Sequence, residues 1–272
     1  MEYQQSIIQK WKLDVWMERI NSVEDKVADI AEKRKTAADI ENILIRNYAR
    51  IVLCLKEVIT LLLNGYPDGA LCIARTVYEL DIITEFIYKM HQKGDSTELI
   101  ERYFADHNVK AYRNLKNLHE DVSNTSETPE IWKSKAKVFE SHLQDIKKKY
   151  GSLKGEYWWA NICFEGKSPS FAKIDELVNE DHLLRTLYKR ACIGIHASAM
   201  GTSALLGRDN ENGNMIYTSQ TDEGFEAPLL LGMISHDRFV EVLCDYWKWE
   251  KDLLMCNMDS TYQEYLINSL IR

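Results

Sequence analysis

Apolar side chains recur at helical spacing along almost the whole chain, and this pattern predicts long α-helices. Residues 2–20 fit a short amphipathic helix, and Asn21-Ser22 offers a cap before the next one. Residues 24–63 contain no helix breaker, so they predict one long helix or two helices that break near residues 33–35. The first half of this stretch is rich in charge. It either projects from the core or packs with one solvated face.

The following segment is the expected centre of the fold. Asn64-Gly65 is a typical left-handed helix end, and Pro67 suits the first turn of the next helix. Residues 67–90 are apolar nearly all round, which indicates a central, buried helix. Because the connection between these two helices is short, we expect them to lie antiparallel.

The rest of the chain predicts more helices, one irregular segment and one small β element. Further helices are expected near 98–121, 129–150, 171–179, 181–206 and 228–258, with a short one after them. Residues 151–170 fit no regular pattern. Residues 209–214 have turn chemistry, and residues 215–220 alternate enough for a small strand or hairpin arm.

These elements predict an all-α fold, an antiparallel bundle of long helices with a small β-hairpin or irregular insertion near residues 207–224. With only 12 Gly and 4 Pro in 272 residues, a sandwich or barrel would lack turns. No repeat or low-complexity linker is present. We therefore expect one helical domain over residues 1–272, with its core at 46–258 and residues 1–45 as an N-terminal extension.

Charge and cysteine content narrow the functional classes. The formal net charge of −8 argues against a surface coated with positive charge for wrapping long nucleic acid, although a local basic cleft remains compatible. Six cysteines show no pair separated by two residues, so zinc-ribbon and redox spacings are absent. Four of them lie in apolar helical patterns, which is typical of small core residues. We therefore infer that the protein resides in a reducing cytoplasm.

Neither a targeting segment nor a membrane-spanning segment is expected from the sequence. Its N-terminus does not resemble a signal peptide. The longest apolar run, Ile51 to Leu63, is interrupted by Lys56 and Glu57 and is too short to cross a bilayer. We therefore expect a cytoplasmic protein that does not associate with membranes.

The strongest chemical signal is an arginine and a histidine on one predicted helix, Arg190 and His196, with five residues between them. An imidazole titrates near neutrality and can move a proton, and a guanidinium can hold a phosphate and offset developing charge. Two residues six positions apart on a helix are separated by about 9 Å along the axis and by a rotation of about 240°. The long arginine side chain must therefore bend around the helix to reach the histidine. The alternative interpretation is a buried core histidine and a surface arginine.

A second charged pair lies in the central apolar helix. Arg75 and Glu79 are four residues apart and share one helix face. Asp81 and Glu85 follow with the same spacing. The Arg75 pair is either a structural ion pair that braces the bundle or a phosphate ligand with its orienting carboxylate.

Two further features have both a functional and a structural interpretation. The predicted helix 181–206 carries a basic group, which could follow a nucleic-acid backbone or be an ordinary charged face: His182, Arg185, Lys189 and Arg190, with Lys173 nearby. Trp158-Trp159 could stack on bases, but tryptophans in an irregular loop are more often buried in the core.

Motifs for cofactor and metal chemistry are absent from the sequence. No His-Glu-x-x-His helix, phosphate-binding Gly-rich loop, dinucleotide fingerprint or Gly-x-Ser-x-Gly turn occurs. The remaining histidines, His91, His107, His119 and His142, are scattered and form no metal set. If the protein is an enzyme, we expect chemistry without a metal or a cofactor.

Three segments of the sequence resemble a known superfamily. The Arg-x5-His stretch from Tyr188 to Ser198 resembles the motif of the HEPN (higher eukaryotes and prokaryotes nucleotide-binding) superfamily. The segment Gly65 to Glu79 and the loop from Trp159 to Phe171 resemble a bacterial family of unknown function close to HEPN proteins. The resemblance covers roughly residues 45–255.

This resemblance implies an antiparallel helical bundle that dimerises, with two motifs facing each other in a cleft. It implies metal-independent RNA cleavage, often by toxins or phage-defence effectors, that leaves a 2′,3′-cyclic phosphate. His196 would be the general acid/base and Arg190 the phosphate clamp. The expected substrate-binding residues are Tyr188, Lys189, Ser198, Arg75 and Glu79. One departure is Ala191, since the residue after the arginine is polar in many active members.

The sequence leaves two other functions open. The first is a non-catalytic module that binds RNA, a nucleotide or a partner protein. The second is a structural or antitoxin-like partner whose apolar helices bind another chain.

Overall fold

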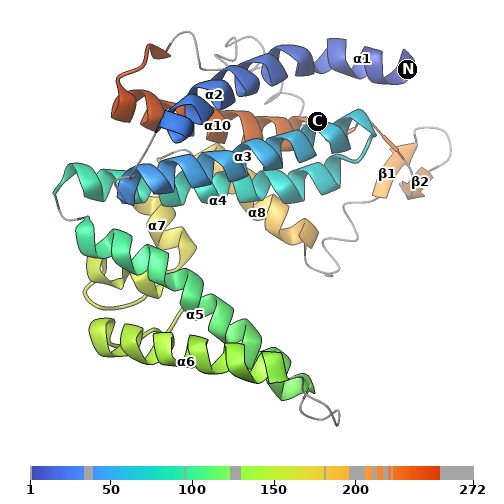
Figure 1. The fold of residues 1–272 in the computed structure, drawn as a ribbon. Coiled ribbons are helices and arrows are strands. Elements are labelled where there is room, and N and C mark those ends of the chain that lie inside the picture. The colour runs from blue at the N-terminus through green and yellow to red at the C-terminus, as the bar shows by residue number, and fades with distance from the viewer. Residues whose placement is uncertain are drawn as a thin grey trace. The chain divides into compact units, whose positions relative to one another are not determined.

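The computed structural model describes residues 2–33, 39–94, 96–122, 130–180, 182–195, 206–209, 213–216, 220–221 and 223–251. The fold is all-α with one small β-hairpin, as the sequence predicts (Figure 1). Its helices are α1 (Glu2–Trp11), α2 (Leu13–Lys33), α3 (Asp39–Leu63), α4 (Pro67–Gln92), α5 (Thr97–Val122), α6 (Glu130–Tyr150), the 3₁₀ helix η1 (Trp158–Cys163), α7 (Phe171–Val178), α8 (His182–Ile195) and α10 (Glu226–Trp247). The two strands are β1 (Leu206–Asp209) and β2 (Gly213–Ile216).

The described residues fall into two compact units. The first unit lies within residues 1–85 and 179–272, and the second unit lies within residues 86–178. Helix α4 begins in the first unit and ends in the second, so no linker marks the boundary. The single-domain interpretation of residues 1–272 stays a prediction.

The position of the break between the first two helices differs from the prediction, because the structure buries apolar side chains on both sides of it. The break lies at Lys12, whose φ is 50°, and α2 runs through the predicted cap at Asn21-Ser22 without interruption. Trp11 and Leu13 are both buried. In a continuous helix they would point about 200° apart, so the break lets both side chains enter the core. Helix α2 buries one apolar face and therefore packs rather than projects.

The turn between α3 and α4 forms as predicted. Gly65 has a φ of 75°, its N–H donates to the Leu62 carbonyl at 2.9 Å, and the Tyr66 N–H donates to the Leu61 carbonyl at 2.9 Å. These two bonds make a Schellman motif, which satisfies the last carbonyls of α3. Figure 1 shows α3 and α4 side by side and antiparallel.

The core of the first unit forms around α3, which contacts α1, α2 and α10, and α10 in turn contacts α8. At Gly232, helix α10 lies close to side chains of α2 and α3. A Cβ there would lie 3.4 Å from both the Leu55 and the Trp16 side chains, so a glycine suits this crossing. Helix α10 ends at Trp247, earlier than predicted, because Lys248 adopts a left-handed φ of 59° and the rings of Trp247 and Trp249 stack 4.9 Å apart.

The β-hairpin lies close to its predicted position. Strands β1 and β2 pair antiparallel, with Leu206 opposite Ile216 and Gly207 opposite Met215. The first strand occupies residues that we predicted as a helix end and a turn. Residues 196–205 of the predicted helix 181–206 lie outside the described residues.

The second unit is built on α5, which contacts α6 and η1. Trp158 and Trp159 are 0% and 1% exposed, so they are core residues, as expected for tryptophans in an irregular segment. The Trp158 indole N–H donates to Asp106 at 2.6 Å. Burial raises the pKa of Asp106, and the hydrogen bonds from Lys110 and Trp158 oppose this rise.

None of the described helices combines the length and the apolar character that crossing a lipid bilayer requires.

Candidate functional site

The first candidate site joins α4 to α8 and consists of Arg75, Glu79 and Tyr188, here called the Arg75 cluster. The Arg75 Nη2 atom lies 2.7 Å from Glu79 Oε1, and the Tyr188 hydroxyl donates to the same oxygen at 2.9 Å. The guanidinium also lies over the Tyr188 ring, 5.4 Å from its centroid. Arg75 and Glu79 remain 30% and 24% exposed, so a ligand in solvent can reach both side chains.

Electrostatics fix the protonation states of the Arg75 cluster. Burial works to lower the pKa of Arg75, but the hydrogen bond with Tyr188 and the charge of Glu79 raise it overall. Burial raises the pKa of Tyr188, Arg75 opposes this, and the Glu79 carboxylate adds to the rise. These two shifts keep Arg75 charged and the Tyr188 hydroxyl protonated at neutral pH, so Tyr188 acts as a hydrogen-bond donor to Glu79.

One donor of the Arg75 cluster is unsatisfied. Among the described residues, no acceptor bonds to the buried Nε atom of Arg75. A buried N–H without an acceptor is costly, so this arrangement of the cluster carries a free-energy cost.

Helix α8 presents the sequence motif on a different face. Leu184, Leu187 and Ala191 are buried, whereas Lys189 and Arg190 are exposed. Arg190 lies two residues after Tyr188, which is roughly 200° around the helix. The structure therefore brings Arg75, Glu79 and Tyr188 together and places Lys189 and Arg190 on the solvent side of α8.

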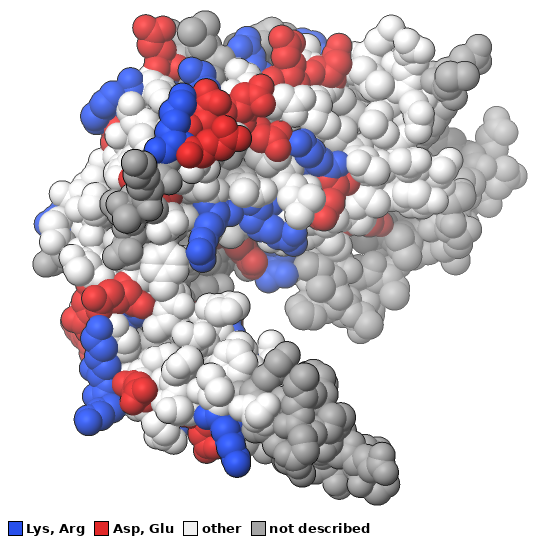
Figure 2. Space-filling view, in the orientation of Figure 1, with Lys and Arg blue, Asp and Glu red and all other residues white. Residues whose placement is uncertain are grey.

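Two predicted site residues of the motif follow α8 in the sequence. His196 and Ser198, our predicted general acid/base and substrate contact, are outside the described residues. The last described residue of α8 is Ile195. Figure 1 shows α8 antiparallel to α4, so the Ile195 end of α8 lies on the side of the α4 N-terminus. In Figure 2, Lys and Arg side chains gather over the region where Figure 1 draws α4 and α8.

A second polar group of the first unit consists of Asp81, Glu85, Asn179 and Arg238, here called the Arg238 cluster. The Arg238 Nε atom lies 3.0 Å from Asp81 Oδ2, and its terminal nitrogens bind Glu85 and Asn179 Oδ1. Asp81 is 0% exposed. Burial works to lower the pKa of Arg238, but the charges of Asp81 and Glu85 raise it overall.

The two clusters meet through aromatic rings. The Asn179 amide donates to the Tyr78 hydroxyl at 2.7 Å, and the Tyr78 and Tyr188 rings lie 5.2 Å apart. Helices α4, α8 and α10 are thus joined by a continuous line of polar and aromatic contacts.

Sequence reasoning missed two polar partners on α10. The pair Asp81 and Glu85 in an apolar helix requires a cation, and the structure supplies Arg238 from a helix that is distant in sequence. His236 is fully buried and lies 3.2 Å from the Tyr48 hydroxyl. A polar residue on the buried face of an otherwise apolar helix is the signal that could have found both.

Within the part of the chain that the structure describes, no group of three or more His, Cys, Asp or Glu side chains could hold a metal ion.

Comparison with known proteins places the chain in a family. A family model matches residues 41–214, more than half of the chain, so the protein belongs to the family of unknown function DUF5677. The match begins two residues into α3, covers α4 to α8 and ends within β2, and it therefore includes the whole Arg75 cluster. No curated protein and no solved structure shows significant similarity to the chain.

Proposed function

We propose that this protein is a metal-independent endoribonuclease of the HEPN type. The observation that carries the proposal is the anchoring of α8, the helix that carries Arg190, to the Arg75 cluster on α4. This contact fixes the rotation of α8 and leaves Arg190 accessible to a phosphate. It also keeps a second, partly exposed guanidinium on the neighbouring helix.

The proposed reaction needs one mobile proton and one fixed cation. The 2′-hydroxyl of a ribose attacks the adjacent phosphorus, and the bond to the 5′-oxygen breaks. His196 shuttles the proton from the 2′-hydroxyl to the leaving 5′-oxygen. Arg190 holds the phosphate and offsets the charge of the pentavalent state. The products carry a 2′,3′-cyclic phosphate and a 5′-hydroxyl.

The exposure of Arg190 favours a dimeric site. A phosphate clamp on an open helix face is weakened by water and salt, and a second wall would exclude both. We propose a cytoplasmic homodimer in which the solvent faces of two α8 helices oppose each other across the RNA. Lys189 then contacts the RNA backbone. A toxin or phage-defence effector would need control, and an antitoxin-like partner covering this face would supply it.

The ribonuclease proposal is tested with purified protein, mixed RNA and excess EDTA. Wild-type protein should cleave the RNA and leave 2′,3′-cyclic ends, which mass spectrometry identifies. His196→Ala and Arg190→Ala should each reduce cleavage at least about 100-fold. His142→Ala, which changes an exposed histidine of α6 outside the basic group of α8, is the control and should leave cleavage unchanged. Intact RNA with both folded wild-type protein and His196→Ala contradicts the proposal.

A second candidate function has support from the Arg75 cluster itself. Because Glu79 neutralises Arg75 and Tyr188 stays protonated, the cluster can bind a ligand without chemistry. In that case the protein is a non-catalytic nucleotide- or RNA-binding module. Thermal stabilisation by nucleotides without turnover, lost in Arg75→Gln, would favour this function over cleavage.

A further inference from the structure

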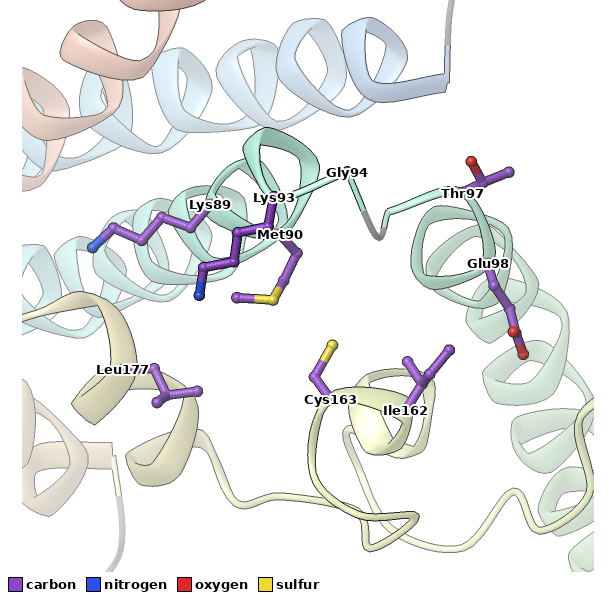
Figure 3. Close-up of a pocket in the computed structure, with 9 residues that line it drawn as sticks. All are labelled: Lys89, Met90, Lys93, Gly94, Thr97, Glu98, Ile162, Cys163 and Leu177. Carbon is purple, nitrogen blue, oxygen red and sulfur yellow. The ribbon is translucent and has the colours of Figure 1, made fainter.

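The second unit contains a pocket that the proposed ribonuclease does not use. It has a volume of about 650 Å³ and is lined by the end of α4, the start of α5, the end of η1 and the end of α7. This volume falls within the range of about 300–1,000 Å³ that is typical for small-molecule sites. Figure 3 shows the nine lining residues, which are Lys89, Met90, Lys93, Gly94, Thr97, Glu98, Ile162, Cys163 and Leu177.

Apolar side chains make one part of the pocket wall. Met90, Ile162 and Leu177 contribute aliphatic or thioether surface, and Cys163 adds a thiol. Ile162 and Leu177 are 41% and 53% exposed, unusually high values for large apolar residues in this unit. Covering these two side chains with an apolar group would remove hydrophobic surface from water, which favours a ligand with an apolar body.

The polar part of the pocket is positive. Lys89 donates to the Val178 carbonyl at 3.1 Å, so its ammonium is already held at the end of α7. Lys93 lies one helical turn further on and is exposed, and among the described residues no carboxylate pairs with it. The carboxylate of Glu98 is bound by Arg102, with Oε1 to Nη2 at 2.6 Å, so its charge is matched. Figure 3 shows the Lys93 amine on the same side of the pocket as Met90 and Leu177.

We propose that this pocket binds a small carboxylate with an aliphatic tail, whose charged end meets Lys93 and whose tail covers Ile162 and Leu177. No aromatic ring is present among the nine lining residues, so stacking of a nucleobase has no support there. The Lys93 ammonium, which no described carboxylate pairs with, matches a single negative charge better than a polyphosphate. The ligand is therefore an aliphatic monoanion rather than a nucleotide.

The experiment uses octanoate as the probe and the full-length protein. The Cys163 sulfur lies in the pocket wall, so bound octanoate should slow its alkylation by iodoacetamide. Peptide mass spectrometry separates Cys163 from the other cysteines. We expect octanoate to slow labelling of Cys163 at least about fivefold at saturation, because a tail that fills the pocket covers the thiol. Labelling of Cys72 in the first unit should be unchanged.

Two variants separate the charge from the apolar wall. Lys93→Gln should weaken octanoate binding about three- to tenfold and leave neutral 1-octanol unaffected. Leu177→Ser should weaken both probes. Lys147→Gln, an exposed lysine of α6 outside the pocket, is the control and should change neither. Both pocket residues are exposed, so these variants should fold, and melting curves check this.

Two results would overturn the proposal. The first is unchanged Cys163 labelling at saturating octanoate in folded wild-type protein. The second is an equal octanoate concentration for half-maximal protection in wild type, Lys93→Gln and Leu177→Ser, which would place the probe elsewhere. Ribonuclease activity is a separate readout, so neither result bears on the proposed cleavage.

Discussion

Arg238 is a partly buried cation shared by two carboxylates of α4, and its replacement by methionine tests how the first unit is held together. At the observed 3.0 Å, an effective dielectric constant of about 20 gives about 5–6 kcal/mol of attraction to Asp81. Burying the guanidinium costs several kcal/mol, which offsets most of this gain in the wild-type protein. In Arg238→Met, however, the fully buried Asp81 loses its cation.

We therefore expect Arg238→Met to lower the free energy of unfolding of the first unit by about 3–5 kcal/mol. Methionine keeps much of the apolar volume of arginine, so the loss comes mainly from charge and hydrogen bonding rather than from a cavity. The bond from Arg238 to Asn179 is also lost, and Asn179 positions the Tyr78 hydroxyl.

Hydrogen exchange read by mass spectrometry measures this loss unit by unit. Backbone amides of α10 that exchange through opening of the first unit should exchange more than about 100-fold faster in Arg238→Met. Peptides of α6 report on the second unit and provide an internal reference. Lys248→Met, which removes an exposed cation just after α10, is the matched variant and should leave exchange unchanged.

A double variant identifies the source of the loss. Replacing Asp81 by asparagine in the Arg238→Met background removes the unpaired buried charge, and it should recover a large part of the lost stability. The reasoning fails if Arg238→Met changes α10 exchange less than about fivefold. It also fails if the double variant is no more stable than the single one.

Three further predictions concern single contacts. Tyr188→Phe removes the hydrogen bond to the α4 carboxylate and should cost about 1–2 kcal/mol in urea unfolding, whereas an unchanged midpoint contradicts the anchoring of α8. In urea unfolding, Gly155→Ala should lower the free energy of unfolding by at least about 1 kcal/mol more than Gly94→Ala does. Both glycines have a positive φ, but only at Gly155 would the new Cβ clash, because it would lie 2.3 Å from the Ser168 hydroxyl oxygen. Burial raises the pKa of Asp106, so its contribution to stability is present at low pH and lost as the pH rises through its folded-state pKa. The stability of wild type relative to Asp106→Asn should therefore fall between pH 4 and pH 8, and a pH-independent difference would refute this.

The helices of this protein were predictable where local chemistry and packing agree. The end of α3 needed only Asn64-Gly65 and Pro67, because a left-handed glycine and a first-turn proline specify the connection by themselves. At Asn21-Ser22 the same kind of signal failed. Burial of the apolar face of α2 outweighs the capping preference of two residues, which is worth about 1 kcal/mol.

The candidate site was predictable only in part, since its partners come from distant helices. The spacing of Arg75 and Glu79 predicted their ion pair, because four residues bring two side chains together on any helix. Tyr188 was singled out by its place next to the motif. Its hydrogen bond to Glu79 depends on how α8 packs on α4, which spacing along one helix does not determine.

The charges of the two clusters limit where an anionic substrate could approach. The Arg238 cluster has one cation and two carboxylates, so it repels a phosphate, and its charges are largely buried. The Arg75 cluster is neutral in sum, although its guanidinium is partly exposed. Lys189 and Arg190 add two exposed cations on α8. In a chain with a net charge of −8, the solvent face of α8 is therefore the part of this site that attracts an anion. If the protein binds RNA as proposed, the binding depends on these few local cations, and salt should weaken it with the shallow slope of two or three phosphate contacts.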